Sequence, residues 1–161
     1  MSVFFWIVFA IAILLAISIV NGAPYLPTPS KQIETAFKLS KLKKGEKLVD
    51  LGSGDGTVLV YAAKRGIDAT GYEINPLLWL ISSIRLLPYR QIARVKLTSF
   101  WGQPLGKFDV VFVFLIGHHM QRLEDKLSAE LKNTRVISHA FEIPSRTSKQ
   151  ENGVFLYEYG K

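Results

Sequence analysis

The sequence predicts an α/β fold: a mostly parallel sheet of about six strands with helices between them, preceded by one N-terminal transmembrane helix. Residues 3–20 are apolar except for Ser18, and the first 30 residues carry no charged side chain. The remaining chain, long enough for one compact domain, alternates short apolar strands with helical patterns. A glycine-rich turn joins the first strand of this alternation to the helix that follows it.

The apolar run at residues 3–20 predicts the membrane span. As a helix it would extend about 27 Å, close to the roughly 30 Å hydrocarbon core of a bilayer. A cleaved signal peptide and a buried core helix are alternatives, but the start lacks a basic side chain and the run lacks a polar stripe. Every lysine and arginine follows the span, so the positive-inside rule predicts a single-pass membrane protein whose folded domain is cytoplasmic.

The rest of the chain follows in order. Pro and Gly predict an extended connector over residues 21–30, and apolar spacing predicts a helix over residues 31–42. Residues 108–116 are nearly all apolar, which is typical of a strand buried on both faces of a parallel sheet. The last strand is expected to be antiparallel at the sheet edge. The predicted strands are 47–51, 68–73, 94–98, 108–116, 134–141 and 154–159, and the further helices are 57–64, 76–87 and 119–131.

The turn after the first strand has glycines at positions 52, 54 and 56, two residues after Asp50. Such glycines let the backbone approach a ligand closely, and the next helix offers free N–H groups. The second strand ends in Glu73, whose carboxylate can accept hydrogen bonds from ribose hydroxyls. A dinucleotide-binding fingerprint would put its last glycine at Thr57, so the spacing disfavours NAD. A structural turn without a ligand is the other alternative.

The sequence DLGSGDG at residues 50–56 resembles motif I of the class I (seven-β-strand) S-adenosylmethionine-dependent methyltransferases. The resemblance implies a Rossmann-like methyltransferase sheet and S-adenosyl-L-methionine as cofactor. It places the loop around the methionine part of the cofactor and the acid after the second strand on the ribose. The cofactor contacts that it implies are Asp50, Gly52, Ser53, Gly54, Asp55, Gly56 and Glu73.

Four stretches narrow the resemblance: PYLPTP at 24–29, VDLGSGDG at 49–56, GYEINP at 71–76 and LEDKL at 123–127. Together they are similar to the membrane-associated protein-lysine methyltransferases that modify the adenine nucleotide translocase and the c-subunit of ATP synthase. This resemblance implies a methyltransferase domain over residues 24–161 behind an anchor at 1–23, and adds Thr28 and Asn75 to the cofactor contacts. Where the family tends to have an acid beside the adenine amino group, this chain has Ser99.

Methyl transfer from a sulfonium to an amine is an in-line displacement that needs no metal, so positioning and desolvation do most of the work. The acceptor lysine must be neutral, which a dry site favours. The candidate catalytic residues are His118 and His119, which follow the fourth strand, and Tyr25, whose proline-rich segment can close over the cofactor. Alternatively, the histidines cap the next helix or face water, and the segment around Tyr25 is a plain linker.

The sequence therefore predicts a membrane-anchored methyltransferase with the bilayer and a membrane-protein lysine as partners. The alternatives are a methyltransferase of a lipid or other membrane-embedded small molecule, and a non-catalytic cofactor-binding module. No nucleic acid partner is expected, because the fourth strand ends in LIGHH and lacks the [DN]-P-P-[YF] turn of many base-amino methyltransferases. Much of the net charge of +7 is assigned to the lysines that follow the predicted span.

Overall fold

The computed structural model describes residues 2, 5–6, 9 and 26–160, and a seven-stranded sheet runs through the last of these ranges. The strand order is β3-β2-β1-β4-β5-β7-β6; β1 to β5 are parallel, and β7 is antiparallel to both of its neighbours. The strands are β1 (Lys47–Leu51), β2 (Asp68–Glu73), β3 (Ala93–Leu97), β4 (Val110–Val113), β5 (Thr134–His139), β6 (Lys149–Glu151) and β7 (Val154–Tyr159).

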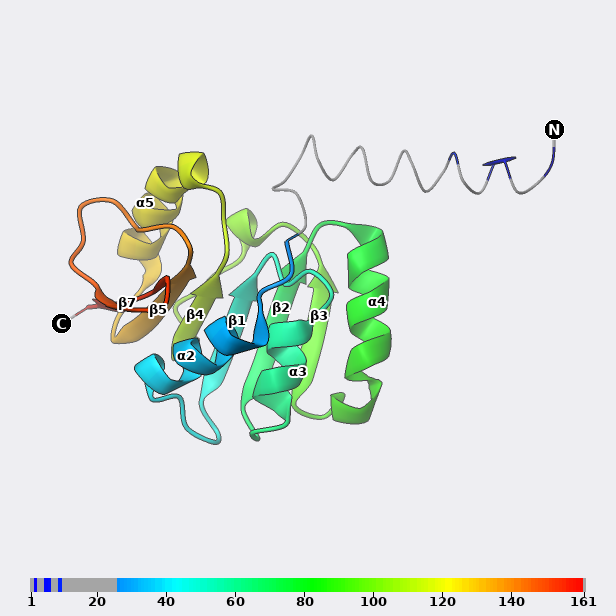
Figure 1. Cartoon of the computed structure of the whole chain (residues 1–161), viewed down its shortest axis with the longest axis horizontal. Helices are drawn as coiled ribbons and strands as arrows, with labels where there is room; N and C mark the ends of the chain where they lie inside the picture. The colour runs from blue at the N-terminus through cyan, green and yellow to red at the C-terminus, as the bar shows by residue number, and fades with distance from the viewer. Residues whose placement is uncertain (1, 3–4, 7–8, 10–25, 161) are drawn as a thin grey trace.

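Helices cover both faces of this sheet. They are α2 (Ser30–Ser40), α3 (Thr57–Ala63), α4 (Pro76–Leu86) and α5 (Met120–Glu130), with short 3-10 turns at Leu87–Tyr89, Phe100–Gly102 and Gly117–His119. In Figure 1, α2, α3 and α4 lie on the near side of the sheet. Side chains from α5 belong to a separate core cluster from those of α2 and α3. The sheet is therefore the middle layer of three.

The alternation of the strands explains the two cores. Leu48 of β1 packs into the cluster of α2 and α3, whereas its neighbour Val49 packs into the cluster of α5. Successive side chains of a strand point to opposite faces, so a central strand needs apolar residues at consecutive positions. All four residues of β4 are buried for this reason.

The predicted sheet of about six strands is wrong by one strand. Residues Lys149–Glu151 form β6, which the sequence pattern does not predict because the segment is short and polar. The strand at Val154–Tyr159 is antiparallel as predicted, but it lies between β5 and β6 instead of at the edge. Its first four residues, Val154 to Tyr157, are all buried, a pattern that fits an internal strand.

The predictions of an N-terminal transmembrane helix and of a single-pass membrane protein with a cytoplasmic catalytic domain are also corrected. Among the described residues, no helix is long and apolar enough to cross a membrane. The longest of these helices have 11 residues, about 16 Å of rise, whereas the core of a bilayer is about 30 Å thick. Most of residues 3–20, on which the prediction rested, lie outside the described part of the chain.

Candidate functional site

A cavity of about 430 Å³ opens at the carboxyl ends of β1, β2 and β4. Ligands of open parallel sheets bind at this edge, beside the point where the strand order reverses. Here the reversal falls between β1 and β4. The connector before α2 also reaches the cavity, since Leu26, Pro27 and Thr28 line it.

The glycine turn between β1 and α3 forms one wall. Gly52, Gly54 and Gly56 all have positive φ, at 80°, 54° and 79°, a region that side chains with a Cβ rarely adopt. The amides of Gly52 and Ser53 donate to the carbonyl of Tyr72, at 2.9 and 3.0 Å. The turn is therefore fastened to the end of β2, and the positions predicted for the loop take the shape that its glycines allow.

Glu73 joins the glycine turn to the start of α4. Its Oε2 accepts the amide of Gly54 at 2.8 Å, and its Oε1 accepts the amides of Ile74 at 2.9 Å and Asn75 at 2.8 Å. The side chain of Asn75 then caps α4 by accepting from the amides of Leu77 and Leu78. A carboxylate offers about four lone-pair positions, so Glu73 keeps capacity for a hydroxyl donor in the cavity.

Asp50 lies at the floor of the cavity, and its residue is only 3% exposed. Burial, with added repulsion from Glu73 and Asp55, raises the pKa of this carboxyl from 3.8 to about 8. Without a ligand the group is therefore mostly protonated at neutral pH. A cationic ligand group beside it would favour the ionised carboxylate.

Arg85 of α4 holds the far end of the glycine turn. Its guanidinium forms an ion pair with the carboxylate of Asp55 and donates to the hydroxyl of Thr57 at 3.0 Å. Asp55 in turn accepts the amide and the hydroxyl of Thr57, the first residue of α3. These contacts fix the turn at the point where it enters the helix.

The other end of the cavity is apolar and aromatic. Phe114, Leu115 and Ile116 follow β4, and Phe141 follows β5. Trp101 lies across from them, with the guanidinium of Arg122 over its ring at 4.1 Å from the centroid. Such a wall excludes water from a group that lies against it.

The two neighbouring histidines differ in position. His119 lines the cavity, whereas His118 is exposed and contacts His119 with ring centroids 3.9 Å apart. Burial, helped by the nearby His118 and Arg122, lowers the pKa of His119. The imidazole that faces the cavity is therefore held more readily in its neutral form.

Most residues predicted for the site meet at this cavity. Those that line it are Thr28, Asp50, Gly52, Ser53, Gly54, Asp55, Glu73, Asn75, Ser99 and His119. Gly56 does not line it, because this residue precedes α3 and packs against Ser82 of α4. His118 is exposed and does not line the cavity, and Tyr25 lies outside the described residues.

The aromatic end is not predicted from the sequence. Phe114, Phe141 and Arg122 line the cavity but belong to no motif in the sequence. Their location could have indicated a role in the site, since Phe114 and Phe141 come within two residues of the carboxyl ends of parallel strands. Arg122 carries no such signal, because its proximity to Trp101 is formed only when α5 packs on the sheet.

Several curated proteins that are similar to this chain are named lysine N-methyltransferases. The chain is 36% identical over 135 residues to the lysine N-methyltransferase of the ATP synthase c-subunit from Homo sapiens, covering 81% of this chain and 57% of that protein. It is 38% identical over 128 residues to the adenine nucleotide translocase lysine N-methyltransferase of Mus musculus, covering 76% and 55%. The chain thus spans a little over half the length of these animal relatives.

A microbial relative matches over nearly its whole length. The chain is 33% identical over 158 residues to a protein-lysine N-methyltransferase of Saccharolobus islandicus (strain REY15A), covering 89% of this chain and 98% of that protein. Among solved structures, an RNA methyltransferase from Salinibacter ruber in complex with S-adenosyl-L-homocysteine superposes with a TM-score of 0.75 at 23% identity, covering 83% of this chain and 92% of that one. This structural likeness shows the fold.

A family model supplies the assignment. The model described as "ANTKMT methyltransferase domain" matches residues 50–150, a stretch that runs from the acid before the glycine turn to the middle of β6. It includes every strand of the sheet that contributes residues to the cavity except the start of β1. Together with the relatives above, this match shows that the chain belongs to the ANTKMT methyltransferase domain family.

Proposed function

We propose that this chain is an S-adenosylmethionine-dependent protein-lysine N-methyltransferase that modifies a lysine of another protein. The observation that carries the proposal is the carboxylate of Glu73, which the backbone of two loops holds at the wall of the cavity. The printed names of the relatives from Homo sapiens, Mus musculus and Saccharolobus islandicus support lysine as the acceptor. We assign the methyltransferase domain to residues 24–161.

The cavity suits the proposed cofactor in size and chemistry. A volume of about 430 Å³ lies within the usual range of small-molecule sites. Glu73 has acceptor capacity for one ribose hydroxyl, and buried Asp50 can pair with the cationic amino group of the methionine part. The buried hydroxyl of Ser53 lacks a hydrogen-bond partner among the described residues and lies in the same wall. Thr28, Asn75 and Ser99 complete the proposed cofactor contacts.

The residues of the chain bind and orient the reactants and exclude water from them. When bound, the cofactor would supply an electrophilic methyl group on a sulfonium, whose carbon an amine can attack in line while the sulfur leaves as a thioether. Phe114, Ile116 and Phe141 exclude water from the acceptor amine and so disfavour its charged form. We assign the orienting role to His119, whose lowered pKa keeps a ring nitrogen free to accept a proton or a hydrogen bond. His118 and Tyr25 remain secondary candidates for this role.

The protonation of Asp50 predicts how cofactor affinity depends on pH. The free protein holds a proton on this carboxyl up to about pH 8, whereas the bound cofactor favours the carboxylate. Binding then releases a proton below pH 8, so affinity should rise roughly tenfold per pH unit toward pH 8 and level off above it. Isothermal titration calorimetry with S-adenosylmethionine between pH 6 and 9, in buffers of different ionisation enthalpy, measures both the affinity and the released proton.

The variant Asp50→Asn is the control for this prediction. Its amide cannot titrate, so the difference in pH dependence between wild type and variant isolates the carboxyl from the cofactor's own amine. Affinity should be weaker in the variant and should vary less with pH. Parallel pH profiles for the two proteins would contradict the assignment of the proton to Asp50.

The function is tested by transfer of labelled methyl groups. The protein is incubated with radiolabelled S-adenosylmethionine and a total extract of its source cells, beside the variants Gly54→Arg and Glu73→Ala. A labelled protein band that is absent with both variants, and that yields methyl-lysine by mass spectrometry, is the expected result. Label in the organic extract would instead indicate a small-molecule acceptor, and cofactor binding without any labelled product would indicate a module without turnover.

A further inference from the structure

The loops at the amino ends of the parallel strands form an edge of the sheet opposite the cavity. The loop before β1 is joined to the turn before β2, where the amide of Gly45 donates to the carbonyl of Gly66 at 3.2 Å. It is also joined to the loop before β4, where the amide of Lys47 donates to Asp109 Oδ2 at 2.7 Å. The carbonyl of Asp109 accepts the amide of Arg135, at the start of β5. These bonds make one continuous surface of four loops.

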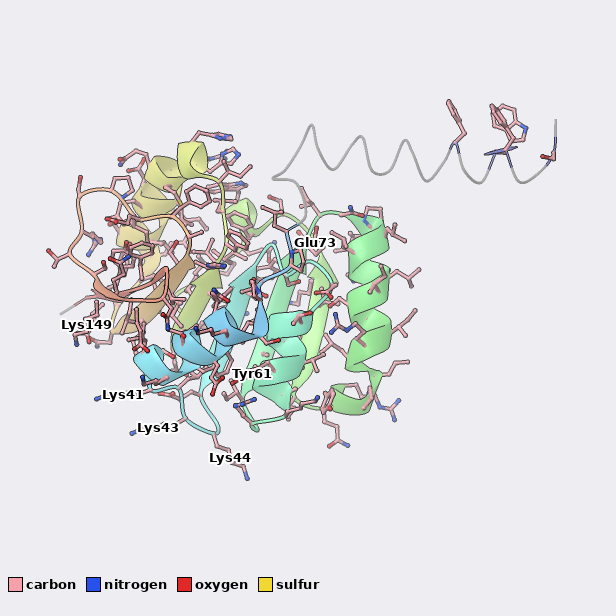
Figure 2. All side chains as sticks on the ribbon, in the orientation of Figure 1. Lys41, Lys43, Lys44, Tyr61, Glu73 and Lys149 are labelled. Atoms are coloured by element: carbon pink, nitrogen blue, oxygen red, sulfur yellow. The ribbon has the colours of Figure 1, made fainter. Side chains whose placement is uncertain are left out.

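This surface is strongly cationic. The cations that these loops and their flanks expose, which we call the basic edge, are Lys41, Lys43, Lys44, Lys47, Lys64, Arg65, Lys107 and Lys132. Figure 2 shows Lys41, Lys43 and Lys44 at the end of the molecule opposite Glu73. The closely spaced lysines that precede β1 thus lie as far from the cavity as the sheet permits.

The positive charge of the basic edge is not neutralised within the described part of the chain. Across residues 26–160, none of its eight cations takes part in an ion pair. The nearby acids form no ion pair with these cations: Glu46 pairs with Arg135, Asp68 pairs with Arg94, and Asp109 accepts the backbone amide of Lys47. Some of the cations are also held in place, since Arg65 lies over the ring of Tyr61 at 3.4 Å from the centroid.

We propose that the basic edge binds the phosphate backbone of nucleic acid without reading its sequence. Lysines that contact phosphates supply the sequence-independent part of nucleic acid binding. A protein partner fits less well, because the cores of protein interfaces are rich in aromatic residues and poor in lysine. A membrane surface also fits less well, because amphipathic membrane-binding surfaces add exposed apolar side chains. Within residues 26–160, these four loops expose no large apolar side chain, and Leu87, which precedes β3 at the same edge, is the one such residue in the fifth loop.

This proposal differs from the expectation from the sequence, in which no nucleic acid partner was expected. Much of the net charge was assigned there to residues 31–47, beside the predicted span, and to Arg85, Arg90, Arg94 and Lys96. However, α2 begins two residues after Thr28, which lines the cavity wall, and Lys41 follows its last residue on the opposite side. A polyanion on the basic edge therefore leaves the cavity open, and the proposal concerns docking and not methylation of a base.

Fluorescence anisotropy with a labelled duplex DNA of mixed sequence tests the proposal. The full chain is titrated at several salt concentrations between about 50 and 200 mM NaCl, and the logarithm of the association constant is plotted against log salt. If about four phosphates are neutralised, the affinity falls with a slope of roughly −3.6, or −0.9 per phosphate. The variant Lys43→Gln/Lys44→Gln should weaken binding and reduce the magnitude of the slope by about 1.8.

A matched variant removes the same charge elsewhere. Lys31 at the start of α2 and Lys96 near the end of β3 are exposed and lie outside the basic edge. The variant Lys31→Gln/Lys96→Gln should keep the wild-type slope, and both variants should bind S-adenosylmethionine as the wild type does, which separates this proposal from the proposed function. No DNA binding at the lowest salt, or equal slopes in the two variants, would overturn it. Binding to phosphatidylserine vesicles is measured in parallel. If the wild type binds these vesicles but not DNA, and Lys43→Gln/Lys44→Gln loses the vesicle binding, the proposal is wrong and the partner is a membrane surface.

Discussion

Replacing Glu73 by alanine is expected to weaken S-adenosylmethionine binding by at least about tenfold. The proposed ribose contact is one hydrogen bond to a charged acceptor, which contributes roughly 1.5–3 kcal/mol, or about 13- to 160-fold in Kd. The substitution also leaves the amides of Gly54, Ile74 and Asn75 without their acceptor, so both loops lose the group that holds them. Isothermal titration calorimetry measures the change in Kd.

The variant Glu73→Gln separates the two effects. It keeps the shape of the side chain and one carbonyl acceptor but loses the charge, so its affinity should fall between those of wild type and Glu73→Ala. Circular dichroism of each variant without cofactor shows whether the sheet has remained folded. An affinity of Glu73→Ala within threefold of wild type would remove this residue from the cofactor site.

The second large effect is expected at Gly56, where alanine should lower the free energy of unfolding by about 2–5 kcal/mol. The residue has a φ of 79°, and forcing a side chain into this region costs about 1–2 kcal/mol. A Cβ at this position would also overlap with the hydroxyl of Ser82, which adds about 1–3 kcal/mol of overpacking. Urea unfolding followed by circular dichroism gives the difference from wild type.

Two further variants divide this loss between its causes. Gly52 has a similar φ of 80° with nothing within 4 Å of the Cβ that alanine would add, so Gly52→Ala reports backbone strain alone. The hydroxyl of Ser82 is buried without a hydrogen-bond partner among the described residues, so Ser82→Ala should be nearly neutral. In that background Gly56→Ala should cost at least about 1 kcal/mol less. An equal cost in both backgrounds would assign the whole loss to the backbone.

The parts of the fold that local patterns encode were predictable from the sequence. The strands at Lys47–Leu51 and Asp68–Glu73 were predicted with the observed bounds, because each has an acid at or next to its last residue and a turn after it. The strand Lys149–Glu151 was not, because its three polar residues pair only with β7 and carry no apolar period. The place of β7 inside the sheet depends on long-range pairing, which the pattern of one strand does not contain.

The candidate site divides in the same way. The glycine turn and Glu73 were found because a close backbone approach requires glycines, and because these glycines and the carboxylate at the end of β2 occur at a fixed spacing in the sequence. Phe114 and Phe141 were not found, since apolar residues after buried strands look like the continuation of those strands. The distinction between His118 and His119 is set by the 3-10 turn at Gly117–His119, which directs one ring toward the cavity and the other toward solvent.

The internal position of β7 has a consequence for protein synthesis. Residues Val154–Tyr159 supply the partner of β5 and also contact α2, so they close the sheet on one side. A ribosome makes the chain from its N-terminus, and until these residues emerge β5 presents an unpaired edge to other nascent chains. Translation pauses after β5 would therefore prolong the interval in which a chaperone has to cover that edge.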